Sequence, residues 1–429
     1  MRIAYICADP GIPVFGQKGC SIHVQEVIRA LRQQGATVEL FAVRWGDDPP
    51  ADLADLKVHR LPPIPKGEPG LREQIAFAIN PDLQTELHLS GPFDLIYERY
   101  SLWSYSAMEF AQTMRIPGIL EVNAPLIEEH AKHRGLVHRE TAEQVAERVF
   151  HAATGIVAVS EEVKGYLHRW GMADKVQVIP NGVNHRRFTT HRQSVIPKSS
   201  DIFTVGFVGS LKPWHGLSCL VNAFAQLHQW VPQSRLLIVG EGPQRDTLQA
   251  DLEHRDLLHV SHLTGAVPPS DIPALLASMD VAVAPYPANL DFYFSPLKVV
   301  EYMAAGLPVV VSDIGQLSHL VAHGKTGWLC PPGHEGALAD ALAQLWRSPE
   351  LRQRLGQAGR QYILTHHTWE MVAQRILTMA FGQVFPENQY PIPETGQSLP
   401  GKGRSGFAQA LQPTSPSPEG GVYHENLKR

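Results

Sequence analysis

Short apolar runs alternate with helix-like stretches along most of the chain. In the first half the runs are IAYIC (3–7), TVELFAV (37–43), DLIYE (94–98), GILEVN (118–123), GIVAVS (155–160) and VQVIP (176–180). The second half repeats the arrangement with TVGFVGS (204–210), RLLIVGEG (235–242), HVSHLTG (259–265), VAVAPY (281–286), PVVVSD (308–313) and GWLCPP (327–332). Strands that alternate with helices are typical of parallel α/β sheets. The pattern therefore predicts two doubly wound, Rossmann-like domains.

The periodic pattern stops in two places. After PNGVN (180–184), the stretch HRRFTTHRQSVIPKSSD (185–201) is polar and irregular, which predicts a domain boundary there. Beyond Phe385, the segments GQSLPGKGRSG and PTSPSPEGG have no periodic apolar face. Residues 386–429 are therefore predicted to form a disordered tail.

One predicted helix, in SPLKVVEYMAAGLP (295–308), has clear boundaries. Ser295 can cap its first turn, and Pro296 suits the first helical position. Gly306 can adopt the left-handed conformation that ends a helix, and Pro308 prevents its continuation.

The same helix carries a carboxylate on its predicted core-facing stripe, which consists of Leu297, Val300, Glu301 and Ala304. An unpaired buried carboxylate costs several kcal/mol or shifts its pKa, so Glu301 must have a polar partner or face a cleft. The alternative is a solvated helical ion pair between Glu301 and Lys298.

Composition narrows the class of protein. The chain has 429 residues, 44% of them hydrophobic, and no apolar run that could span a bilayer, so we expect a soluble protein with two cores. The N-terminal MRIAYICADP is too short and soon too polar for a secretory signal. A net charge of −5 argues against a general nucleic-acid binder. The four cysteines lack CxxC spacing, which argues against a zinc site or a disulfide framework and fits a reducing cytoplasm.

The segment SPLKVVEYMAAGLPVVVSDIGQLSHLVAHGKTGWLCPPG (295–333) resembles the signature of the retaining glycosyltransferases of family 4. This resemblance, which extends from residue 1 to about residue 381, implies the GT-B fold, in which two Rossmann-like domains face a cleft. It implies an acceptor domain of residues 1–185, completed by a helix near 368–385, and a nucleotide-sugar domain of residues 200–367. It also implies that the helix start at Ser295, Pro296 and Leu297 receives the donor diphosphate and that Glu301 binds the ribose hydroxyls.

A second donor-site loop is expected in the first domain, in GIPVFGQKGCSIHVQEV (11–27). Gly19 is the residue predicted to approach the phosphates, because a residue without a side chain lets backbone N–H groups come close in unusual dihedral angles. The alternative is that Gly19 only makes the turn from strand to helix. His23, four residues later, is interpreted as a core residue of the helix rather than as a site residue.

The loop VGFVGSLKPWHGL (205–217) departs from the family pattern. Most relatives have Arg directly after the glycine that corresponds to Gly209, and Lys at the position of His215, whereas this chain has Ser210 and His215 there. Lys212, in the same loop, is predicted to supply the missing cation to the departing diphosphate. The alternative is a solvated loop lysine.

A further departure affects the donor sugar. The family motif has two glutamates eight positions apart, and Tyr293 stands at the first position, which touches the transferred sugar in relatives. Lys298 is a further donor-site candidate. The nucleobase is expected against the backbone of Gly265 to Val267, so no side chain identifies the nucleotide.

Acceptor contacts are expected where YERYSLWS (97–104) and ILEVNAPLIEEH (119–130) follow two strands of the first domain, because open α/β sheets bind ligands at the carboxyl ends of their strands. The acceptor candidates are Arg99, Glu121 and Glu128. Asn123 lies where relatives often have His, and together with Glu301 and Lys212 it is predicted to carry the reaction. The alternative for Glu128 is an acidic residue in the first turn of a helix.

The sequence therefore predicts a cytoplasmic, metal-independent, retaining glycosyltransferase that uses a nucleoside diphosphate sugar as co-substrate and needs no other cofactor. Its acceptor would be a saccharide, a lipid-linked sugar or a small molecule, with peripheral membrane contact left open. Two alternatives remain: a sugar-nucleotide epimerase on the same fold, and an inactive nucleotide-sugar-binding scaffold, which the changes at Ser210, His215 and Tyr293 would permit.

Overall fold

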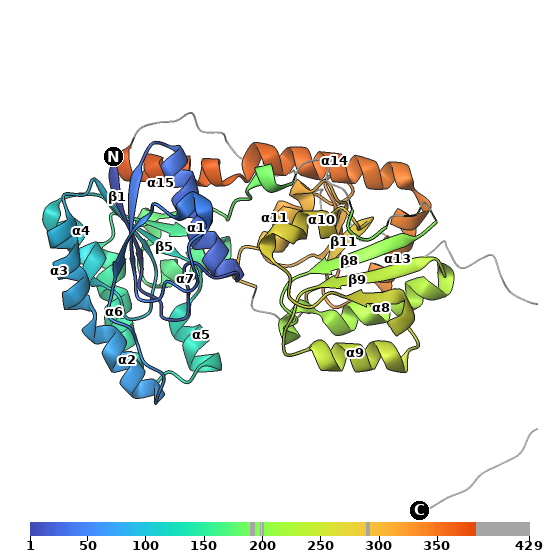
Figure 1. Cartoon of the computed structure of the whole chain (residues 1–429), viewed down its shortest axis with the longest axis horizontal. Helices are drawn as coiled ribbons and strands as arrows, with labels where there is room; N and C mark the ends of the chain where they lie inside the picture. The colour runs from blue at the N-terminus through green and yellow to red at the C-terminus, as the bar shows by residue number, and fades with distance from the viewer. Residues whose placement is uncertain (189–193, 198, 200, 289–291, 383–429) are drawn as a thin grey trace, which may run out of the picture. The chain divides into compact units, whose positions relative to one another are not determined.

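The computed structural model of the chain describes residues 1–188, 194–197, 199, 201–288 and 292–382 (Figure 1). The predicted tail, residues 386–429, lies outside the described residues. Among the residues that are described, no helix combines the length and the apolar character needed to cross a membrane.

The first half of the chain forms a seven-stranded parallel sheet with the order β3-β2-β1-β4-β5-β6-β7. Its strands are β1 (Arg2–Cys7), β2 (Thr37–Ala42), β3 (Lys57–Arg60), β4 (Leu95–Arg99), β5 (Gly118–Val122), β6 (Gly155–Ala158) and β7 (Val176–Val178). All of these except β3 overlap the predicted runs. The sequence of β3, KVHR, lacks an apolar pattern because β3 is an edge strand with exposed ends.

The second half forms a six-stranded parallel sheet with the order β10-β9-β8-β11-β12-β13. Its strands are β8 (Phe203–Val208), β9 (Ser234–Val239), β10 (Ser261–Leu263), β11 (Val281–Ala284), β12 (Val309–Ser312) and β13 (Trp328–Cys330). Every one of them overlaps a predicted run.

Helices accompany both sheets (Figure 1). The first half contains α1 (Gly19–Gln33), α2 (Pro69–Ala78), α3 (Asn80–Ser90), α4 (Ser106–Met114), α5 (Leu126–His133), α6 (Arg139–Ala152) and α7 (Glu161–Arg169). The second half contains α8 (Leu217–Trp230), α9 (Arg245–His254), α10 (Ile272–Leu276), α11 (Leu297–Ala304), α12 (Gln316–Leu320), α13 (Glu335–Arg347) and α14 (Pro349–His366).

Each sheet is buried on both faces. Along β1, Ile3 and Tyr5 belong to one apolar cluster, whereas Ala4 and Ile6 belong to another on the opposite face. Alternation of this kind follows from the two-residue repeat of a strand. The fold is therefore two parallel α/β domains of the doubly wound type, as the pattern predicts.

The last described helix, α15 (Trp369–Phe381), packs against the first sheet although it follows the second one in sequence. Trp369, Ala373 and Ile376 are buried in the same cluster as Tyr5 and Ile28, and Figure 1 shows α15 beside α1. Thr368 caps its first turn by accepting a hydrogen bond from the backbone N–H of Met371 at 3.3 Å.

The two connections between the halves of the chain lie side by side. The N–H of Val183 donates to the carbonyl of His367 at 2.8 Å, and Val183 also forms a parallel bridge with Thr368. At Gly182 the backbones approach so closely that a Cβ atom would lie 2.6 Å from the backbone nitrogen of Trp369. Only glycine fits there without movement of the second connection.

Candidate functional site

The loop that follows β8 begins with Gly209, which has a φ of 151°. A side chain at this position would meet Lys298, because a Cβ atom would lie 2.8 Å from Lys298 Nζ. The Lys298 side chain of α11 therefore reaches the carboxyl end of β8. This is the end of the sheet at which open α/β folds bind ligands.

Lys298 has a buried amine. Its Nζ atom lies 4.5 Å from the ring centre of Phe207 and 5.5 Å from that of Tyr286, and it has no hydrogen-bond partner among the described residues. Burial lowers the pKa of Lys298 to about 7. The proposed helical ion pair with Glu301 is therefore wrong, because Glu301 pairs with Arg187 instead.

His215, which stands where relatives have a lysine, is buried and neutral. Its Nδ1 lies 2.5 Å from the carbonyl oxygen of Ser210, which assigns the proton to Nδ1. Burial, and then the charge of Lys298, lowers the pKa of His215 to about 3. Ser210 is exposed and uncharged. Neither of the two positions at which this chain differs from the family pattern therefore carries a cation.

Lys212 lies at the rim of this loop. It is half-buried, and its Nζ is 5.6 Å from the ring centre of the exposed Trp214. Its predicted contact with the diphosphate stays a prediction, and Lys298 is a second cation at the same loop.

Glu301 has a partner that the sequence reasoning missed. Arg187 Nη1 lies 3.4 Å from Glu301 Oε1, and Arg187 Nη2 donates to the carbonyl of Pro269 at 2.6 Å. Burial raises the pKa of Glu301 to about 7, and the charge of Arg187 opposes that rise. A quarter of the Glu301 side chain remains exposed, which leaves room for a ligand hydroxyl.

The start of α11 differs in detail from the prediction. The helix begins at Leu297, with Pro296 at the capping position and no side-chain cap. The predicted cap by Ser295 is wrong: its buried Oγ accepts a hydrogen bond from the backbone N–H of Asn181 at 3.2 Å. At the other end, Gly306 has a φ of 78°, as predicted.

The N-terminal ends of α1 and α11 lie close together. Gly19 is the first residue of α1, and a Cβ atom there would lie 3.8 Å from Leu297 Cδ1. Gly19 has ordinary helical geometry, so the argument from unusual dihedral angles is wrong, although the space beside it is open. Neither helix has an acidic residue in its first turn. The N–H group of Leu297 already donates to the carbonyl of Ser295 at 3.0 Å, but the dipoles of two adjoining helix ends still favour negative charge there.

The loop predicted to contact the nucleobase is already partly paired. Gly265 has a φ of 71°, and its carbonyl accepts from Gly240 N at 3.0 Å and from Thr264 Oγ1 at 2.9 Å. Val267 is half-buried and packs against the second domain's core. Of this loop, the carbonyl of Gly265 is therefore held by the protein.

In the first domain, Glu121 is buried at the end of β5 and surrounded by donors. Tyr97 and Asn123 donate hydrogen bonds to it, Arg99 Nη1 lies 3.1 Å from Oε1, and His23 Nε2 lies 3.3 Å from Oε1. Burial alone would raise the pKa of Glu121, but its electrostatic interactions with His23 and Arg99 and these hydrogen bonds outweigh it and lower the pKa. Glu121 is thus occupied by protein groups and orients Arg99 and Asn123.

His23 is 2% exposed, and its ring contacts that of Trp369 edge-on at 5.1 Å. Burial lowers its pKa to about 4. The interpretation of His23 as a core residue is consistent with this position.

Tyr293 reaches the first domain. Its hydroxyl donates to Glu129 Oε2 at 3.0 Å, and its carbonyl accepts from Ser160 Oγ at 2.6 Å. Glu128 is exposed in the first turn of α5, as its alternative interpretation has it, whereas Glu129 is the carboxylate that faces Tyr293. The sequence analysis names Glu128 as the acceptor candidate and does not name Glu129.

Glu129 also borders a hollow of about 140 Å³ through its partner Arg134, whose Nη2 lies 2.8 Å away. This hollow opens beside the carboxyl ends of β1 and β4, and its polar lining includes Asp9, Arg72, Ser101, His130 and Arg134. Among the residues that the structure covers, no three His, Cys, Asp or Glu side chains gather in a way that could hold a metal ion.

Comparisons with known proteins bear on the family and the fold. Residues 18–187 match the family "Glycosyltransferase Family 4", and residues 188–362 match "Glycosyl transferases group 1". A phosphatidyl-myo-inositol mannosyltransferase from Mycobacterium leprae is 28% identical over 399 residues, which cover 88% of this chain and 96% of that protein.

Solved structures show the same fold. Sucrose-phosphate synthase from Thermosynechococcus elongatus superposes with a TM-score of 0.68 at 22% identity, over 88% of this chain and 98% of that one. HepE from Anabaena, solved in complex with UDP, gives 0.67 at 20% identity, over 89% of this chain and all of that one. The chain therefore has the GT-B fold and belongs to the group 1 glycosyltransferases, with a family 4 glycosyltransferase domain in its first half.

Proposed function

We propose that this protein is a retaining glycosyltransferase that moves a sugar from a nucleoside diphosphate sugar to an acceptor hydroxyl. The observation that carries the proposal is the buried, unpaired amine of Lys298 beside Gly209. A buried cation without a partner is unfavourable. An anionic ligand would explain why the Lys298 amine lies buried at the carboxyl end of a sheet. The donor diphosphate is such a ligand.

In this proposal the diphosphate lies between Lys298 and the adjoining ends of α1 and α11. Lys298 takes the place of the cations that relatives have at the positions of Ser210 and His215, and Lys212 adds a second charge from the rim. As the bond to the sugar breaks, charge grows on the diphosphate, and fixed charges and helix N–H groups stabilise it without reorganisation.

The rest of the donor follows from this placement. Glu301 accepts hydrogen bonds from the ribose hydroxyls, which requires its charged form and is favoured by Arg187. The base lies against the backbone near Ala266 and Val267, and Tyr293 lies toward the transferred sugar. UDP bound to HepE supports a nucleoside diphosphate.

The acceptor binds in the first domain, in the hollow lined by Arg72, Ser101 and Arg134, near the Tyr293–Glu129 contact. Glu121 keeps Asn123 and Arg99 in place near the ends of β4 and β5. The acceptor hydroxyl attacks the face of the sugar that the leaving group departs, and a phosphate oxygen takes its proton, so no protein nucleophile and no resident metal are needed. The reaction is expected in the cytoplasm.

Lys298 provides the decisive test. We predict that Lys298→Met folds at least as stably as the parent, because a buried unpaired amine is replaced by an apolar side chain of similar length. Its affinity for UDP, GDP or ADP should fall about tenfold or more, since a charge-assisted contact is lost. Thermal shift with each nucleotide, followed by calorimetry, measures both effects.

Lys325→Met, at an exposed lysine of the same domain, is the matched control and should bind nucleotide normally. Unchanged affinity in the Lys298 variant would show that the diphosphate binds elsewhere. Nucleotide binding without any sugar transfer or release would instead favour the inactive scaffold.

A further inference from the structure

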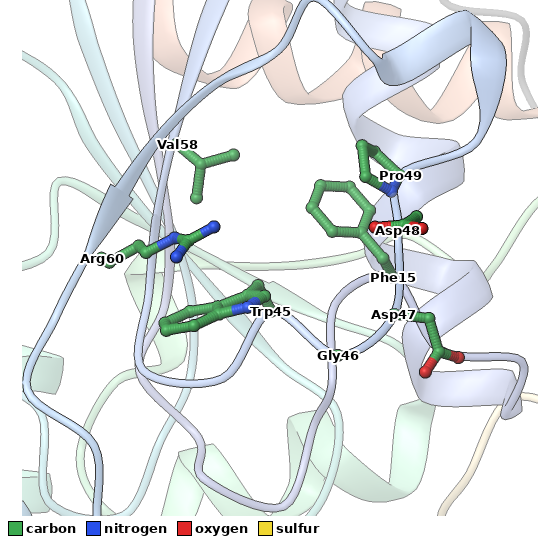
Figure 2. Close-up of a pocket in the computed structure, with 8 residues that line it drawn as sticks. All are labelled: Phe15, Trp45, Gly46, Asp47, Asp48, Pro49, Val58 and Arg60. Carbon is green, nitrogen blue, oxygen red and sulfur yellow. The ribbon is translucent and has the colours of Figure 1, made fainter.

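A second hollow of about 420 Å³ lies in the first domain, beside the ends of β2 and β3 (Figure 2). Figure 2 shows the guanidinium of Arg60 over the indole of Trp45 on one side, and Phe15, Pro49 and Asp48 on the other. The guanidinium carbon of Arg60, Cζ, lies 4.1 Å from the Trp45 ring centre. This volume is within the range of about 300–1,000 Å³ that is usual for small-molecule sites.

The hollow has an unusual balance of charge. Arg60 offers only hydrogen-bond donors, and Asp48 offers only acceptors. Within the described part of the chain, neither side chain has an ion-pair partner. Stacking on the indole holds the guanidinium in one place, so its free edge is ordered before any ligand arrives.

The remaining lining is apolar and comes from Phe15, Trp45, Pro49 and Val58. An apolar ligand would leave Arg60 and Asp48 desolvated without partners, which is costly. A simple anion would be repelled by Asp47 and Asp48, and a simple cation by Arg60. A ring that carries hydroxyl groups can accept from Arg60, donate to Asp48 and lay its C–H face on the apolar wall.

The floor of the hollow is joined to the donor loop. Phe15 N donates to the carbonyl of Trp45 at 2.6 Å, and Val14 N donates to that of Arg44 at 3.0 Å. At Gly46, a Cβ atom would lie 2.8 Å from Pro13 Cβ, so the two loops are in close contact. The same segment continues to Gly19 at the start of α1, where the diphosphate is proposed to bind.

We propose that this hollow is a saccharide subsite, which holds a sugar unit of the acceptor remote from the hydroxyl that reacts. The assignment to the acceptor rests on the proposed function, whereas the binding of a sugar in the hollow does not. The protein would then act on an acceptor that already contains at least one sugar.

The test measures direct binding of simple sugars without any nucleotide. Methyl glycosides of glucose, mannose, galactose and N-acetylglucosamine are titrated into the full chain and followed by saturation-transfer difference NMR. We expect at least one of them to bind with its C–H protons saturated from one face. Its affinity should fall about tenfold in Arg60→Gln, because a hydrogen bond from a charged group is lost.

Two further variants complete the design. Trp45→Ala removes the stacking surface and should also weaken binding, whereas Trp230→Ala, at an exposed tryptophan on α8, should not. If Trp45→Ala melts early, the exposed Arg60 variant still decides the question. Inorganic phosphate serves as the anion probe.

Binding of no sugar in the panel, or binding that Arg60→Gln leaves unchanged, would overturn the inference. Competition by phosphate that depends on Arg60 and not on Trp45 would overturn it as well, in favour of an anion site. Because nucleotide affinity is measured separately, failure here leaves the proposed function standing, and loss of nucleotide binding leaves the saccharide result standing.

Discussion

Ionisable groups buried without a full set of partners distinguish this chain at the scale of single residues. Lys298 and Glu301 lie at the proposed donor site, where a bound ligand would supply their missing hydrogen-bond partners. Glu98 is different: it is fully buried in β4, hydrogen-bonded by Ser104 Oγ at 2.5 Å through one oxygen, and its other oxygen has no partner among the described residues. It lies among core side chains, and its effect is therefore on stability.

Glu98 should make folding stability depend on pH. Burial raises its pKa from 4.5 to about 7, so the folded state holds a proton that the unfolded state releases between these two values. The stability that this proton provides is present below pH 4.5 and is lost as the pH rises through 7. The full penalty is about 3 kcal/mol, from roughly 1.4 kcal/mol per pKa unit.

Replacement of Glu98 by Gln should remove this dependence. We expect the melting temperature of Glu98→Gln, relative to the parent, to rise steadily between pH 5 and pH 8. Calorimetric or circular-dichroism melts at several pH values measure the difference. Parallel curves for the two proteins across this range would show that Glu98 stays charged when folded.

The sequence revealed single residues only where a local pattern marked them. Glu301 stood out because it interrupts an apolar stripe, and its contact with Arg187 is consistent with the expected polar partner. Arg187 and Glu129 did not stand out, since their partners Glu301 and Tyr293 lie 114 and 164 positions away. Such contacts leave no mark on the neighbouring sequence, and Arg187 was read as part of a polar linker.

At the scale of elements, the strands were predictable because both faces of each sheet are buried, which makes the strands continuously apolar. The polar edge strand β3 was missed for the opposite reason. The predicted cap of α11 by Ser295 is wrong, because the Ser295 hydroxyl accepts a hydrogen bond from Asn181, a residue distant in sequence. Local rules for helix ends hold only when no tertiary contact competes for the capping side chain.

Gly182 gives a prediction for the paired connections. A methyl group at this position would overlap the backbone of Thr368 and Trp369, so Gly182→Ala should destabilise the protein by about 1–3 kcal/mol. Chemical denaturation measures the change. Gly165→Ala is the matched control, because it lies within α7 with nothing within 4 Å of the new methyl group. That variant should gain up to about 1 kcal/mol, and equal effects of both changes would contradict the close packing at Gly182.

At the scale of the whole molecule, the proposed reaction draws its donor contacts from the second domain and from the start of α1, and its acceptor contacts from the first domain. We predict that the product keeps the anomeric configuration of the donor sugar and that transfer continues in the presence of EDTA. NMR of the product anomer, with and without the chelator, checks both points. An inverted product would refute retention, and activity that EDTA abolishes and magnesium restores would refute a metal-free site.

The position of α15 affects how the protein is made on the ribosome. All strands of the first sheet are synthesised early, but the apolar face around Tyr5 and Ile28 is covered only when Trp369 and Ile376 have been made. During translation of the entire second domain, α1 already packs on this face, but the part that α15 covers stays exposed. The first domain therefore cannot complete its core before the second has emerged, and a nascent chain released early would expose a surface prone to aggregation or capture by chaperones.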